Sequence, residues 1–65
     1  MQIILNGQSY RTQVATLEQL LSEQQIELGV VACAIDGNFI AKTQYSSVAL
    51  QEGMRIEVLS PMQGG

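Results

Sequence analysis

The chain has 65 residues, 46% of them hydrophobic, and carries a formal net charge of −3 at neutral pH. This length allows a single domain near the lower size limit for independent folding, and the composition is that of a folded chain. Six acidic side chains stand against three scattered basic ones, so no basic stripe is present. We therefore expect no nucleic-acid partner. A protein with a basic surface is the more suitable partner for this acidic chain.

Nothing in the sequence resembles a membrane span or an export signal. No apolar run approaches the roughly 20 residues that a transmembrane helix needs, and the N-terminus has no basic region followed by an apolar stretch. The single cysteine, Cys33, cannot form an internal disulfide, which agrees with a reducing compartment. We expect a cytoplasmic protein that is monomeric on its own.

The first elements form a predicted β-hairpin. Residues 1–5 alternate as a strand, Asn6 and Gly7 tolerate the positive φ angles of a type I′ turn, and residues 9–14 alternate as the return strand. The side chains expected on one face are Met1, Ile3 and Leu5, then Tyr10, Thr12 and Val14.

A short amphipathic helix follows the hairpin. Thr16 is the predicted N-cap, and Gln19 stands three residues later, which completes a capping box. The helix should end near Gln25, and Gly29 falls in the connection that follows. Its apolar stripe consists of Leu17, Leu20 and Leu21.

The second half of the chain predicts a further hairpin and a final strand. Residues 30–35 form a continuous apolar run typical of a strand covered on both faces or lying centrally in a small sheet. Asp36 and Gly37 supply a turn, and residues 38–41 a short strand. Of these, Phe39 is expected in the core.

The segment 42–49 is expected to be irregular and to be anchored on the core by Tyr45 and Val48. After a turn at residues 50–53, residues 55–59 alternate as the last strand, with Ile56 and Val58 on one side.

The order of elements predicts an α+β fold of the β-grasp type. One main helix would cover one face of a mixed sheet of four to five strands, if the last strand inserts parallel beside the first. Residues 1–60 would form the domain and residues 61–65 a flexible tail, because Pro61 cannot donate a ladder hydrogen bond and glycine orders poorly. Without side chains, Gly64 and Gly65 would let the terminal carboxylate enter a narrow channel.

The chain lacks the residues of a stand-alone enzyme. It contains no histidine, no phosphate-binding loop and no metal-ligand spacing, so we expect no catalytic residue, no metal and no bound cofactor. Cys33 is interpreted as a small buried apolar side chain rather than as a sulfur relay. Ile4 and Leu59 alternate away from the core and form a possible partner-contact patch on the uncovered face of the sheet.

Along its whole length the chain resembles the ThiS family of thiamine-biosynthesis sulfur carriers. Two positions depart from the family pattern and leave the fine partner contacts open: Asp36-Gly37 stands where an Asn is usual, and Met54 where an acidic residue is usual. The segments that carry the resemblance are 1–6, 16–21, 31–36, 50–53, 55–59 and the terminal Gly64-Gly65.

The resemblance implies a sequence of partner reactions at the C-terminus. A ThiF-like activating enzyme, similar to ubiquitin E1, would use ATP to adenylate the carboxylate of Gly65. Sulfur from cysteine would convert it to a thiocarboxylate, and a ThiG-like thiazole synthase would take the sulfur. The tail residues Met62, Gln63 and Gly64 would enter the partner.

Three other functions remain open at this point. The chain could be a MoaD-like small subunit of molybdopterin synthase, although that family is usually longer. It could be a ubiquitin-like modifier joined to lysines through Gly65, or a β-grasp interaction module in which the terminal glycines have no role.

Overall fold

The computed structural model describes residues 1–27 and 31–59. The predictions for Gly29 and for the tail, residues 61–65, lie outside this part of the chain. The elements in chain order are β1 (Gln2–Leu5), β2 (Gln8–Arg11), α1 (Leu17–Glu23), β3 (Ala32–Ile35), β4 (Asn38–Ile40), the 3-10 helix η2 (Lys42–Ser47) and β5 (Arg55–Leu59).

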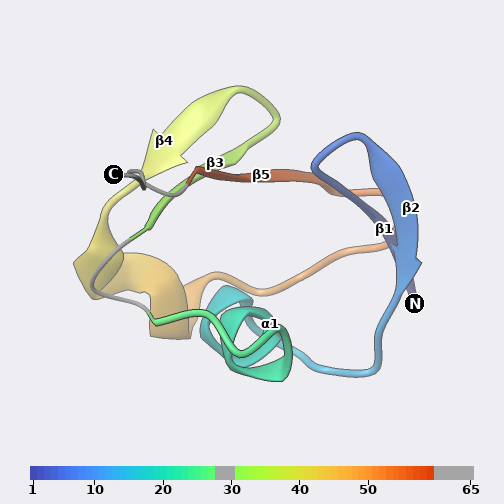
Figure 1. Ribbon diagram of the computed structural model, residues 1–65, viewed down its shortest axis with the longest axis horizontal. Helices are drawn as coiled ribbons and strands as arrows, with labels where there is room; N and C mark the ends of the chain where they lie inside the picture. Colours follow the sequence, from blue (N-terminus) through green and yellow to red (C-terminus); the bar gives the residue numbers. More distant parts are fainter. Residues whose placement is uncertain (28–30, 60–65) are drawn as a thin grey trace.

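The five strands form one mixed sheet in the order β2-β1-β5-β3-β4. β5 lies between the two hairpins, parallel to β1 and antiparallel to β3. Helices α1 and η2 both lie on one side of the sheet, which leaves its other face uncovered (Figure 1). The predicted β-grasp fold is confirmed, including the insertion of the last strand beside the first.

Both hairpins close through the same kind of turn. Asn6 and Gly7 have φ angles of 50° and 81°, and Asp36 and Gly37 have φ angles of 51° and 88°. Positive φ at both central residues is the requirement of a type I′ turn, and Asn, Asp and Gly are the residues that tolerate it. The two turn predictions are therefore confirmed.

The first residue of each turn also contacts the central strand through its side chain. The amide of Val58 donates to Oδ1 of Asn6 at 2.8 Å, and the amide of Arg55 donates to Oδ1 of Asp36 at 3.3 Å. Val58 and Arg55 lie towards opposite ends of β5. The two hairpin turns thus hold the central strand from both neighbouring strands.

Helix α1 begins and packs as the sequence predicts. The amide of Gln19 donates to Oγ1 of Thr16 at 3.2 Å, and the amide of Thr16 donates to Oε1 of Gln19 at 3.2 Å. The helix ends at Glu23, two residues before the expected Gln25, whose positive φ of 61° leaves the helical region. The stripe of Leu17, Leu20 and Leu21 is fully buried.

The core lies between the sheet and the two helices. Its members come from every layer, and Tyr45 on η2 is among them as predicted. The buried apolar cluster comprises Ile3, Leu17, Leu20, Leu21, Val31, Cys33, Tyr45, Leu50 and Ile56.

Three expectations need correction. Residues 42–49 are not irregular, because residues 42–47 form η2. The return strand of the first hairpin ends at Arg11 rather than at residue 14. Phe39 is not in the core: its side chain is 72% exposed. The physical reason is the two-residue period of a strand, which turns the neighbouring Ile40 towards the core and Phe39 to the uncovered face.

Cys33 and Tyr45 are buried together in the core. Burial raises the pKa of the Cys33 thiol and the pKa of the Tyr45 hydroxyl, because the charged forms would lose their hydration. The interpretation of Cys33 as a small buried side chain is confirmed, since a protonated and inaccessible thiol is a poor nucleophile.

The contact between Asn6 and β5 can be tested by replacing Asn6 with Gly, which tolerates the turn but removes the acceptor. We expect the free energy of unfolding to fall by about 1 kcal/mol, the usual net worth of a hydrogen bond, and the amide of Val58 to exchange faster with solvent. Asn6→Asp keeps the acceptor and is the control. Unchanged protection of Val58 in Asn6→Gly would contradict the role of this contact.

Stability should also fall in alkaline solution. A group whose pKa is raised in the folded state contributes stability that is lost as the pH rises through that folded-state pKa. With ordinary pKa values of 9.0 for Cys33 and 10.0 for Tyr45, we expect the free energy of unfolding to decline above about pH 9. Urea titrations from pH 7 to alkaline pH would measure this decline, and Cys33→Ala should reduce its slope. A constant stability up to pH 11 would contradict it.

Candidate functional site

The C-terminal end of β5 is the point from which the predicted tail departs. At this end Leu59 pairs with Ala32 of β3, and one residue earlier the amide of Val58 is held by Asn6. The base of the tail is therefore fixed in the middle of the sheet. The predicted acceptor Gly65 lies with the rest of the tail outside the described residues, so its role stays a prediction.

The uncovered face of the sheet carries an apolar surface beside this end of β5. Among the described residues, Phe39 and Leu59 are the large hydrophobic side chains that are exposed, at 72% and 51%. Phe39 pairs with Ala34, and Leu59 pairs with Ala32, so small side chains separate the two large ones. We call these four residues the Leu59 patch.

The predicted patch of Ile4 and Leu59 is placed differently by the structure. Ile4 is half-buried on β1, where it pairs with Ser9 of β2 and lies beside Arg55 of β5. Arg55 and Leu59 are four residues apart on one strand, a spacing of about 13 Å. Ile4 and Leu59 therefore share a face of the sheet but lie near opposite ends of β5. The large apolar side chain near Leu59 is Phe39 rather than Ile4.

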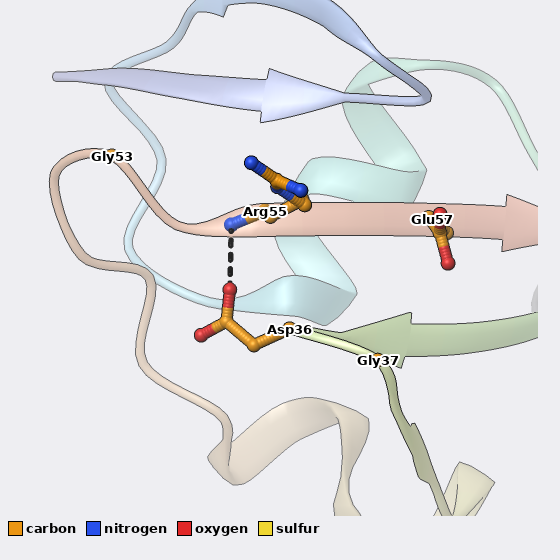
Figure 2. Close-up of a pocket in the computed structure, with 5 residues that line it drawn as sticks. All are labelled: Asp36, Gly37, Gly53, Arg55 and Glu57. Carbon is orange, nitrogen blue, oxygen red and sulfur yellow. Dashed lines mark hydrogen bonds between the residues drawn. The ribbon is translucent and has the colours of Figure 1, made fainter.

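A polar cleft of about 430 Å³ lies near the other end of β5, lined by Asp36, Gly37, Gly53, Arg55 and Glu57. Figure 2 shows the Asp36 carboxylate directed at the backbone amide of Arg55, while the Arg55 guanidinium extends towards β1. The two carboxylates of the cleft can accept hydrogen bonds from a basic group. The cleft thus gives the uncovered face a charged region next to its apolar one.

The described residues contain no group of three or more Cys, Asp or Glu side chains placed to hold a metal ion. Cys33 is inaccessible, and no helix in the described ranges is long and apolar enough to cross a membrane.

Sequence reasoning missed both Phe39 and the cleft. The exposure of Phe39 follows from the alternation of residues 38–40 once the turn at Asp36-Gly37 is placed, so that signal was present. The cleft depends on the turn at Gly53 coming close to the turn at Asp36. Their separation in the chain left no local signal for this proximity.

Comparison with known proteins supports the fold described above. Two solved structures of a thiamine biosynthesis protein (ThiS) from Geobacter metallireducens share the fold, one from a crystal and one from NMR in solution. The crystal structure has a TM-score of 0.84 at 22% identity and covers 100% of both chains. The NMR structure has a TM-score of 0.83 at 22% identity and covers 100% of this chain and 88% of its own.

A search of curated proteins gives no match. The ThiS family profile matches residues 3–65, nearly the whole sequence. The chain therefore belongs to the ThiS family.

Proposed function

We propose that this chain is a sulfur carrier for the synthesis of the thiamine thiazole. A ThiF-like enzyme adenylates the carboxylate of Gly65, a sulfur atom from cysteine then replaces one oxygen, and a ThiG-like thiazole synthase accepts that sulfur. The observation that carries the proposal is the family match, which extends through the terminal Gly64-Gly65. The chain is then a co-substrate of its partners rather than an enzyme.

The chemistry suits a chain with this composition. A carboxylate is a poor electrophile until it is coupled to a good leaving group, and AMP is such a group. The sequence has no phosphate-binding loop, so ATP would bind to the partner. With no Cβ on Gly64 or Gly65, nothing on the side-chain positions would block the approach of the sulfur donor to the last carbonyl.

The domain would contribute docking and a fixed origin for the tail. A partner that covers the Leu59 patch would bury the two large exposed apolar side chains, Phe39 and Leu59. The same surface continues to the carboxylates of Asp36 and Glu57, where basic groups of the partner could bind. Because Leu59 pairs with β3, docking at this face would set where the tail begins.

The role of Gly65 is tested by mass spectrometry of the intact chain after co-expression with a ThiF-like enzyme and a sulfur source. We expect a species heavier by the difference between sulfur and oxygen, and we expect it to be lost when Gly65 is deleted and strongly reduced in Gly65→Ala. The melting temperature of Gly65→Ala should match that of the wild type, because the tail would contribute no packing.

Other results of this measurement would contradict the proposal. Ladders of larger conjugates would indicate a protein modifier, and a mass unaffected by deletion of Gly65 would indicate an interaction module.

The role of the Leu59 patch is tested by Leu59→Ser in an assay of adenylation by the ThiF-like enzyme. Loss of an anchoring side chain typically costs about 1–2 kcal/mol of binding. We therefore expect KM for the carrier to rise roughly 5- to 30-fold, with little change in kcat.

The matched control is Ser22→Ala, an exposed position on α1, on the opposite side of the sheet. It should leave KM unchanged. Equal KM values for Leu59→Ser and the wild type would show that the partner docks elsewhere.

A further inference from the structure

Asn6 connects the turn of the first hairpin to the last part of β5. Its backbone lies in the left-handed region, with a φ angle of 50°, and turns the chain away from β5 at the end of β1. Its amide nevertheless donates to the carbonyl of Ile56 at 2.9 Å, and its Oδ1 accepts from the amide of Val58 at 2.8 Å. One residue thus makes two hydrogen bonds to β5 just beyond the end of β1.

These two hydrogen bonds follow the pattern of a parallel ladder. In such a ladder a residue donates its amide to a carbonyl of the neighbouring strand, and its own carbonyl accepts from the amide two residues further along. The amide of Ile4 donates to the carbonyl of Met54. Two residues later on both strands, the amide of Asn6 donates to the carbonyl of Ile56. The carbonyl of Asn6 would accept next from Val58, and the side-chain Oδ1 takes that place.

The side chain of Asn6 therefore lengthens β1 by one hydrogen bond. The register of β1 with β5 ends at Leu5 and Ile56, whereas β3 pairs with β5 as far as Leu59. In the described part of the chain, Asn6 is what holds β5 from the β1 side past this point. The direction in which β5 ends is thus set by β3 on one side and by Asn6 on the other.

The turn of the second hairpin makes the same substitution at the other end of β5. The amide of Asp36 donates to the carbonyl of Arg55 at 2.9 Å. The amide of Arg55 donates in return to Oδ1 of Asp36 at 3.3 Å, in place of the carbonyl that an antiparallel pair would use. Arg55 is the first residue of β5, so this contact fixes where the strand begins. Of the two turns, the one at Asn6 bears on where the strand ends.

We propose that Asn6 is a positioning residue for the reaction at Gly65: acting through Val58, its side chain fixes the direction in which the tail leaves the sheet. This role rests on the proposed function and adds a residue to it. A fixed origin narrows the orientations open to the terminal carboxylate once the carrier is docked, so a larger fraction of docked molecules is placed to react. Asn6 thus acts on the chemical step, whereas the Leu59 patch acts on docking.

Position 6 has to meet two requirements at once. The left-handed backbone favours Gly, Asn or Asp, and the hydrogen bond from Val58 needs an oxygen at the end of a short side chain. Glycine meets the first requirement alone, and aspartate meets both. Substitution of Asn6 by these two residues therefore separates the turn from the hydrogen bond.

The first measurement is the steady-state adenylation of the carrier by a ThiF-like enzyme. In Asn6→Gly we expect kcat to fall roughly fivefold or more, with KM for the carrier changed by less than about twofold. Asn6→Asp should restore kcat to within about twofold of the wild type. This is the reverse of the division expected for Leu59→Ser. Loss of stability alone would not produce it, because a domain that loses one hydrogen bond stays folded during the assay.

The matched control is Thr12→Val, beside the start of β1 and away from the end of β5. It removes a hydroxyl that donates to Oε1 of Glu23 at 2.7 Å, and so loses a side-chain hydrogen bond elsewhere in the fold. Its kcat and KM should equal those of the wild type. A wild-type kcat in Asn6→Gly would overturn the proposal, and so would an equal fall of kcat in Thr12→Val.

The second measurement is amide ¹⁵N relaxation of the carrier alone, which needs no partner enzyme. We expect the order parameter of the Leu59 amide to lie near the rigid-backbone value of about 0.85 in the wild type and to be lower in Asn6→Gly. Asn6→Asp should restore it, and Thr12→Val should leave it unchanged. An unchanged order parameter in Asn6→Gly would contradict the role of Asn6. If the wild type is not adenylated, the proposed function fails, and this second measurement still decides on Asn6.

Discussion

The structure depends on how β5 is held between two hairpins that are far apart in the sequence. Each hairpin supplies a neighbouring strand, and each turn adds a side-chain oxygen that accepts a hydrogen bond from a β5 amide. Because β5 is parallel to β1, it can reach this place only after the chain has crossed over the sheet through α1 and η2. The burial of Leu17, Leu20 and Leu21 under the sheet is what makes this crossover stable.

This arrangement connects folding with the proposed chemistry. The strand that completes the sheet is also the strand that leads to Gly65, so a carrier that had not folded would not present its tail from a fixed origin. The uncovered face of the sheet is the second feature on which the proposed chemistry depends, because it leaves a surface accessible to a partner. Both helices lie on the other side, and the exposed Phe39 and Leu59 stand where a partner could reach them together with the base of the tail.

Much of the fold could be predicted because its signals are local. Three short motifs, each of at most four residues, determine their own local structure, and all three are present as predicted. They are the turns at Asn6-Gly7 and Asp36-Gly37 and the capping box of Thr16 and Gln19. The 3-10 helix at residues 42–47 could not be predicted, since its sequence has no apolar period and it is fixed by burial of Tyr45. The position of Phe39 was misjudged because hydrophobicity was given more weight than strand alternation. The cleft at Asp36 required knowledge of which turns meet in space.

Burial of Cys33, the one cysteine of the chain, has a further consequence for the activated acyl group that the proposed function places on Gly65. An exposed thiolate near a mixed anhydride would capture it as a thioester, either within one molecule or between two, and the product would be lost to the pathway. Cys33 is fully enclosed and its pKa is raised by that enclosure, so it is withdrawn from such side reactions. Burial of Cys33 also protects the chain from oxidation to a disulfide with another protein molecule.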